Sequence, residues 1–438
     1  MSSKLPFTQT LRLSSPNAPL EPGAAMLVGL GLGFTLYFVA RGWLNAAVVL
    51  LFFFATWQLY VERREPALAA VERKPLLWLV AALVSPLLAV LAVQLLRQEF
   101  VLRYFDAPLR FLMCAVILWC LARRRVNFAA LAGVAFPVAV ILCAGMIFLL
   151  PGASRYFWGD RVATYFMDPL SLSQHVTIAG FLCLFLVDAA GQDATWLRAL
   201  KYIGFAVAIG VALSTGSRSG WVMMPVLTAL WLIGFKRHNS MLRALVVVAA
   251  ILSVCVGAYF LSQVVHQRVD LAVRDTTEYF THGLRDTSIG IRLSLLEINW
   301  LLFLQHPLVG WGFNGTPDIA SMPQVAALTT PMVEGYRIHS GGHNELMQNM
   351  MRMGVFGLAS RLLLFLVPLA FFARAARSVF ATQRTNGYLG LVVVVGYTLA
   401  GLSTEVFNLI YAASYYGLLV AAFGAPAATV PVRADSEP

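Results

Sequence analysis

Two arginines and one histidine are the residues of this 438-residue chain best suited to chemistry. Arg218 lies in a short polar stretch, 215–221, between two long apolar runs, where an isolated charge is costly and usually serves function. Arg292 lies in the first turn of a predicted helix, and His343 follows two glycines at the start of another. Arginine binds phosphate bidentately and stays charged at every relevant pH. A histidine kept neutral by the positive end of a helix can accept a proton.

Each of these residues also has an ordinary structural explanation, which the sequence leaves open. Arg218 fits a side chain that snorkels to a membrane interface. Arg292 fits a surface ion pair with Glu297, which would contribute little to stability. His343 fits a helix-capping or packing residue. Three nearby residues are candidate supporting groups for the same chemistry: His339, Ser217 and Asn344.

Membrane-spanning helices are the elements that must position these residues. The chain is 59% hydrophobic and 12% charged, whereas soluble globular proteins carry about 25% charged residues. This composition excludes a soluble enzyme, a disordered scaffold, a coiled coil and a nucleic-acid binder. A helix crosses the bilayer in about 20 apolar residues, so the chain is predicted to be an all-α polytopic membrane protein with about 12 transmembrane helices. The predicted spans are 24–40, 43–61, 76–96, 109–121, 128–150, 172–189, 199–214, 221–235, 245–261, 355–372, 388–402 and 409–423.

The distribution of positive charge predicts the orientation of these spans. Lys and Arg favour cytoplasmic loops. With the N-terminus inside, 18 of the 32 Lys and Arg residues lie on the cytoplasmic side and six in short outer loops. The other eight lie at or near one long outer segment. Both termini are therefore expected in the cytoplasm. The predicted regions are a cytoplasmic N-terminus at 1–23, spans at 24–261, a periplasmic loop at 262–342, further spans at 343–424 and a cytoplasmic C-terminus at 425–438.

The outer segment at 262–342 is too long for an unstructured loop in a compact protein. Its pattern predicts an amphipathic helix near 264–280, lying along the outer membrane surface. A second helix near 288–304 ends before a His-Pro pair, because proline cannot continue a helix. The glycine-rich stretch that follows allows a close backbone approach. We expect 316–335 to be flexible and His339 to lie in a non-helical stretch, before a helix that continues into the tenth span.

No motif in the sequence calls for a metal or another cofactor. The chain has no D-x-D pair, no H-E-x-x-H, no paired-cysteine metal motif and no P-loop. Carboxylates are also scarce within the predicted spans, which argues against an ion-coupled relay. We therefore expect a function that uses neither a metal nor a cofactor.

Four motifs in order resemble the O-antigen ligase/polymerase superfamily of bacterial envelopes. They lie between about 214 and 357, around the long outer segment. The quoted residues are Ser217-Arg218-Ser219-Gly220-Trp221, Arg292 with Trp300, His306-Pro307-Leu308-Val309-Gly310-Trp311-Gly312, and His343-Asn344-Glu345-Leu346-Met347-Gln348 followed by Gly354-Val355-Phe356-Gly357. The resemblance implies a GT-C-like glycosyltransferase of the bacterial inner membrane, with its active site facing the periplasm.

The resemblance also implies a reaction and its partners. Ligases of this superfamily transfer O-antigen polysaccharide from undecaprenyl pyrophosphate to a sugar hydroxyl of the lipid A–core, among membrane lipids. Our hypothesis is that Arg218 and Arg292 bind the pyrophosphate and that His343 is the general base of an inverting, metal-independent transfer. The alternatives are an O-antigen or capsule polymerase with the same donor, a protein O-oligosaccharyltransferase, and a transporter.

Overall fold

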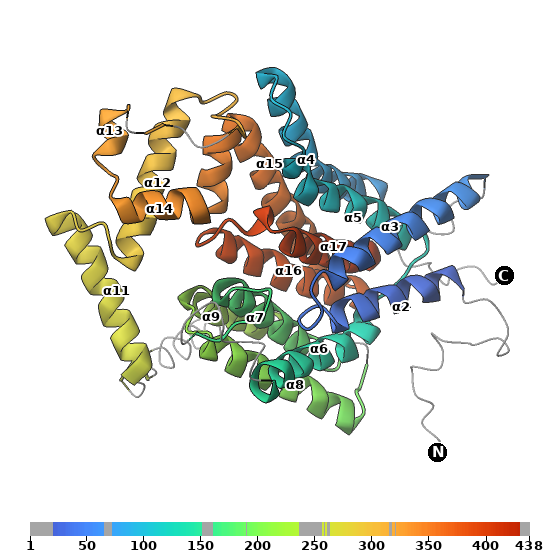
Figure 1. Ribbon diagram of the computed structural model, residues 1–438. Helices are drawn as coiled ribbons and strands as arrows, with labels where there is room; N and C mark the ends of the chain where they lie inside the picture. The colour runs from blue at the N-terminus through green and yellow to red at the C-terminus, as the bar shows by residue number, and fades with distance from the viewer. Residues whose placement is uncertain are drawn as a thin grey trace, which may run out of the picture.

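The computed structural model describes residues 21–64, 72–150, 161–189, 191–235, 256–257, 259–260, 263–314, 318–319 and 321–429. All the regular elements of this described part are helices. They form a large bundle and a smaller group of four helices, α11 to α14, which lies on the left of Figure 1. We call this smaller group, residues 263–340, the outer lobe.

The bundle is built from the apolar runs of the sequence. Its helices are α2 (Pro22–Thr35), α3 (Trp43–Val61), α4 (Arg73–Arg97), α5 (Asp106–Arg123), α6 (Ala129–Leu149), α7 (Pro169–Phe185), α8 (Thr195–Ser214), α9 (Arg218–Phe235), α15 (Glu345–Ala376), α16 (Ala381–Gly401) and α17 (Ile410–Ala427). Short 3-10 turns are η1 (Glu62–Arg64), η2 (Leu102–Phe105) and η4 (Val406–Asn408). Each predicted span within the described residues overlaps one of these helices. The predicted span at 245–261 lies almost entirely outside them.

Seven described helices are long and apolar enough to cross a membrane. They are Trp43–Val61, Arg73–Arg97, Leu102–Arg123, Ala129–Leu149, Thr195–Ser214, Glu345–Ala376 and Ile410–Ala427. Two further apolar helices, α2 and α7, are shorter. The structure thus agrees with a polytopic membrane protein, and the total of 12 spans stays a prediction.

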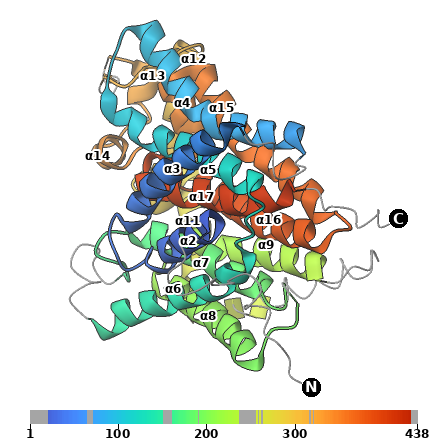
Figure 2. The same cartoon turned by 90° about the vertical axis from the view of Figure 1, so that its right-hand side faces the viewer.

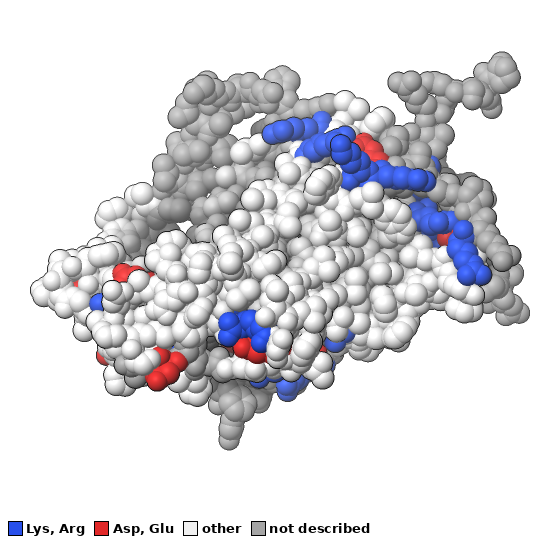
Figure 3. All heavy atoms as spheres, turned by 90° about the horizontal axis from the view of Figure 1, so that it is seen from above, with Lys and Arg blue, Asp and Glu red and all other residues white. Residues whose placement is uncertain are grey.

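The outside of the bundle is apolar, as a lipid environment requires. Large hydrophobic side chains such as Leu50, Phe53 and Trp57 are more than half exposed on α3. Figure 3 shows a broad uncharged face, with Lys and Arg along its upper right edge and a smaller group near its lower edge. The interior is apolar as well. Helix α17 is almost completely buried and packs against α5, α16 and α3, which surround it in Figures 1 and 2.

The outer lobe consists of α11 (Gln263–His282), α12 (Ser288–Gln305), α13 (Pro323–Ala326) and α14 (Pro331–Ser340). The two longer helices were predicted, and α12 does end directly before the His-Pro pair. The expectation for 316–335 was wrong, since it contains α13 and the first half of α14. Placing His339 in a non-helical stretch was also wrong, because it lies in the last turn of α14. Pro331 in the first turn and the Thr330 hydroxyl, which accepts a hydrogen bond from the Val333 amide, provide an N-terminal capping signal.

The outer lobe is fastened to the bundle where α15 is kinked. Gly354 has a φ of 58°, which interrupts the helix. The backbone amides of Trp311 and Gly312 donate to the carbonyls of Met351 and Arg352 at 2.9 Å. The Val355 amide donates to the Pro307 carbonyl at 2.8 Å. The backbone after α12 therefore runs directly against the kink, as the glycines led us to expect.

A β-carbon at the kink should destabilise the protein. In Gly354→Ala, the new atom would lie 2.4 Å from the carbonyl oxygens of Pro307 and Leu308, at a positive φ. We expect a loss of about 1–3 kcal/mol or more, seen as a lower thermal midpoint of the purified protein in detergent. Gly210→Ala is the matched control, because that helical glycine has open space around it and alanine favours the helix. Equal midpoints for the two variants would contradict the role of Gly354.

Candidate active site

Three arginines from three separate segments converge beside the outer lobe. Arg218 begins α9, Arg292 lies in the first half of α12, and Arg161 lies in the segment that precedes α7. Burial lowers the pKa of the Arg292 guanidinium, and the nearby charges of Arg218 and Arg161 lower it further. We call these three residues the arginine cluster. Three like charges in a partly buried place create a field that attracts anions.

The turn before α9 sets the position of two of these arginines. Gly216 has a φ of 63°, which a side chain would disfavour. Its carbonyl accepts a hydrogen bond of 2.9 Å from Arg161 Nη2. The Thr215 hydroxyl accepts from the Ser217 amide, and the Ser217 hydroxyl pairs with that of Ser219 at 2.8 Å. Ser217 is buried, so in this geometry it shapes the turn that carries Arg218.

His343 lies at the N-terminal end of α15, directly before its first turn. Asn344 is the N-cap of α15, and its Oδ1 accepts from the amides of Leu346 and Met347 at 3.0 Å. The Asn344 side-chain amide also donates to the carbonyl of Leu402, which follows α16. Asn344 thus positions the neighbouring histidine by tying together two helices. His343 itself has a φ of 49°, an uncommon conformation for a residue with a side chain.

The two glycines before His343 are required because polar side chains fill the adjacent space. A β-carbon on Gly341 would lie 2.7 Å from Glu405 Oε2. One on Gly342 would lie 2.1 Å from Asn299 Nδ2 and 2.2 Å from Gln348 Oε1. These side chains are themselves held in place. Asn299 donates to Gln348 at 3.2 Å, linking α12 to α15, and Glu405 is paired with an arginine of α15.

Burial also sets the protonation state of His343. It lowers the pKa of the imidazole to about 4, with the charge of Arg292 acting in the same direction. A hydrogen bond with the Ser403 backbone and the charge of Asp168 oppose this shift. The imidazole is therefore neutral at physiological pH. The sequence led us to expect a neutral imidazole from the helix N-terminus, whereas in the structure desolvation is the main cause.

The structure thus brings together Arg218, Arg292 and His343. The Arg292 guanidinium is not in the ion pairs found among the described residues, and Glu297 instead hydrogen-bonds Tyr279. His339 is exposed on α14, and the interactions that define the site in the described part of the chain do not include it.

Three residues of this site were missed by reading the sequence. Arg161 was not among the candidate residues. Asp168 is the N-cap of α7, with Oδ1 accepting from the Leu170 amide at 2.8 Å. Tyr336 of α14 lies with its ring centroid 5.7 Å from that of His343. Aspartate before a proline-led apolar run is a capping signal for Asp168. The other two carry no local signal, since only packing brings them to the site.

Part of the chain is similar to known proteins. Residues 203–362 match the family described as O-antigen ligase. A Haemophilus influenzae protein described as uncharacterized is 21% identical over 203 residues, which are 45% of this chain and 49% of that protein. The chain therefore spans about half the length of this relative. The segment that is similar to this family, residues 203–362, contains Arg218, Arg292 and His343.

Proposed function

We propose that this protein is an O-antigen ligase of the bacterial inner membrane, acting in lipopolysaccharide biosynthesis. It would transfer polysaccharide from undecaprenyl pyrophosphate to a sugar hydroxyl of the lipid A–core. The observation that carries this proposal is the convergence of the arginine cluster with a neutral His343. The family match supports the same kind of reaction, since its region holds Arg218, Arg292 and His343.

The arginine cluster suits the leaving group of this reaction. As the bond between the anomeric carbon and the pyrophosphate oxygen breaks, negative charge grows on that oxygen. Guanidinium groups fixed in advance stabilise this charge in the transition state. They also bind phosphate oxygens bidentately, so the transfer that we propose is metal-independent. Binding of the anionic donor would relieve the repulsion among the three guanidinium groups.

His343 suits the activation of the acceptor. Its neutral imidazole can take the proton of the sugar hydroxyl as the hydroxyl oxygen attacks the anomeric carbon. The new bond forms from the face opposite the departing pyrophosphate, so the anomeric configuration inverts. The electron pair leaves with the pyrophosphate, and the proton stays on His343. The imidazolium is favoured by the same two groups that raise its pKa, Asp168 and the Ser403 backbone.

The positive-inside rule supports a periplasmic site. The orientation that leaves both termini in the cytoplasm puts the outer lobe and the start of α15 on the periplasmic side. Lipid-linked donor and lipid-anchored acceptor can then meet at the outer leaflet. We propose this orientation together with the function.

His343 is expected to be required for turnover. His343→Ala should reduce ligation by about 10²–10⁴-fold, the usual contribution of a general base. The assay uses purified protein, undecaprenyl-pyrophosphate-linked O-antigen and lipid A–core. His282→Ala, a change at an exposed histidine of α11, should retain wild-type activity. If His343→Ala turns over within a few-fold of wild type, another group must act as the base.

Both the charge and the planar shape of the Arg218 and Arg292 guanidinium groups are expected to be required for activity. Arg218→Gln and Arg292→Gln should each lower kcat by about 10²–10³-fold, as for the loss of one oxyanion-stabilising donor. Arg218→Lys and Arg292→Lys should recover only part of this, because lysine cannot bind phosphate bidentately. Arg274→Gln changes an exposed arginine of α11 and serves as the control. Normal ligation by either glutamine variant would exclude that arginine from the pyrophosphate site.

The pH dependence should report the low pKa of His343. A general base must be deprotonated, so kcat/KM falls as the pH decreases through the pKa of the free enzyme. With a pKa of about 4, activity attributable to His343 should persist down to about pH 5, well below the ordinary histidine range near 6.5. The measurement is kcat/KM between pH 4 and 8, corrected for titration of the donor. A midpoint near 6.5 would show that His343 is not desolvated in the working enzyme.

A deletion strain separates ligase from polymerase, which would use the same donor. Loss of a ligase leaves polymer on the lipid carrier and a core without O-antigen. Loss of a polymerase leaves core that bears a single repeat unit. The two patterns are distinguished by gel electrophoresis of extracted lipopolysaccharide. If the second is seen, the protein is a polymerase and lipid A–core is not its acceptor.

A further inference from the structure

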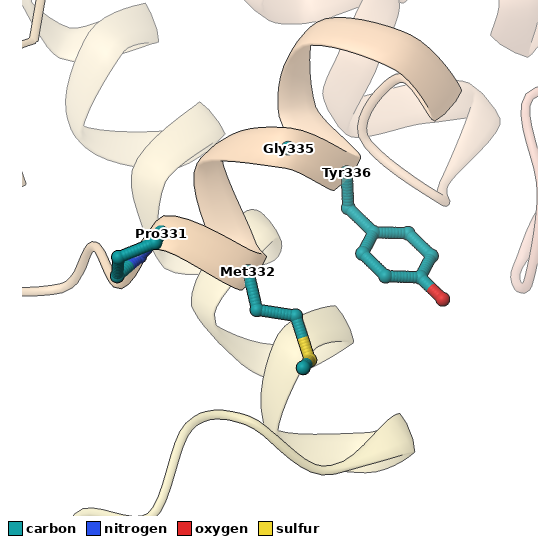
Figure 4. A pocket seen from close by; sticks show the side chains of 4 residues that line it. All are labelled: Pro331, Met332, Gly335 and Tyr336. Atoms are coloured by element: carbon teal, nitrogen blue, oxygen red, sulfur yellow. The ribbon is translucent and has the colours of Figure 1, made fainter.

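One face of α14 is exposed beside His343, the proposed catalytic base. Pro331, Met332, Gly335 and Tyr336 line a shallow hollow of about 300 Å³, at the lower end of the size range of ligand sites. Figure 4 shows the Met332 and Tyr336 side chains extending from the same side of the helix. They are 49% and 41% exposed, so an apolar and aromatic surface faces open space.

This face is held firmly toward the site. The opposite side of α14 packs into the outer lobe, where Val333 is fully buried. Arg337, which is also buried, pairs with Glu334 at 2.6 Å within the same helix. Helix α14 packs against α12, which carries Arg292. Tyr336 and Met332 are therefore presented by a fixed helix rather than by a loose loop.

The tyrosine is also adjacent to both kinds of group that the reaction needs. Its ring lies 5.7 Å from the His343 ring, at an angle of 48°. Tyr336 also lies close enough to Arg292 to oppose the lowering of the pKa of that guanidinium. A hydroxyl within hydrogen-bond reach of His343 must belong to a sugar that occupies the space beside this imidazole. The arginine cluster would take the phosphates, which leaves the Tyr336 side for the acceptor.

We propose that Tyr336 and Met332 form the acceptor subsite, on which the sugar ring that carries the attacking hydroxyl lies. This inference rests on the proposed function. The C–H face of a sugar ring packs on an aromatic ring, and tyrosine combines an apolar body with a polar tip. Such a platform would hold the sugar while its hydroxyl points to His343. A polyprenyl chain is the other occupant that an apolar surface could take, but the hollow is shallow and one of its lining side chains, Tyr336, lies beside His343.

The test is steady-state kinetics in which each substrate is varied at saturation of the other. Tyr336→Ala should raise the acceptor KM by about tenfold or more, because the loss of about 1.4 kcal/mol of binding free energy lowers the affinity tenfold. Met332→Ala should raise it a few-fold, and Tyr336→Phe should stay close to wild type, because the aromatic face remains. The donor KM should not change. Ile338→Ala, at an exposed position outside the hollow, is the matched control.

Further measurements keep the inference distinct from the proposed function. Tyr336→Leu keeps apolar bulk without an aromatic face, so it should fold normally by thermal midpoint and still show the raised acceptor KM. An unchanged acceptor KM in both Tyr336→Ala and Tyr336→Leu, with active wild type, would overturn the subsite alone. A raised donor KM would assign the hollow to the polyprenyl donor and would also overturn it. A wild-type protein that fails to transfer polysaccharide would instead remove the proposed function.

Discussion

Electrostatic repulsion among the guanidinium groups of Arg161, Arg218 and Arg292 is the constraint on which the rest of the site depends. Like charges separate unless a rigid frame holds them, and here each arginine belongs to a different segment. The Gly216 carbonyl binds Arg161 beside the start of α9, while packing of α12 on α15 places Arg292. The packing of these segments therefore fixes a positive field at the place where an anionic leaving group would be stabilised.

The same frame controls the state of His343. Desolvation and the charge of Arg292 keep the imidazole neutral, so the site that attracts an anion also retains a proton acceptor. Gly341 and Gly342 let the backbone pass against Glu405, Asn299 and Gln348 without a clash. The cation field and the base are thus set by one packed arrangement of α12, α15 and the turn after α16.

The apolar runs of the sequence and its helix-ending residues predicted much of the fold. Helix α3 has the bounds expected from hydropathy, and α12 ends at a proline, because these features depend on local chemistry. The turn with Arg218 and the start of α15 were found for the same reason. The region 316–335 was expected to be flexible, yet Thr330 and Pro331 begin a helix there. His339 was expected in a non-helical stretch, but it lies in the last turn of the same helix, which presents Tyr336 to the site.

By itself, therefore, the sequence determined the all-helical membrane character, the local helix boundaries and the residue types capable of gripping phosphate and accepting a proton. Hydropathy, capping and side-chain chemistry are local properties, so they can be read without a fold. Only the tertiary structure decided that Arg161 and Tyr336 join the site and that Arg292 faces other arginines rather than Glu297. Those outcomes depend on distant segments packing together, and the same packing partly buries His343, which lowers the pKa of its imidazole.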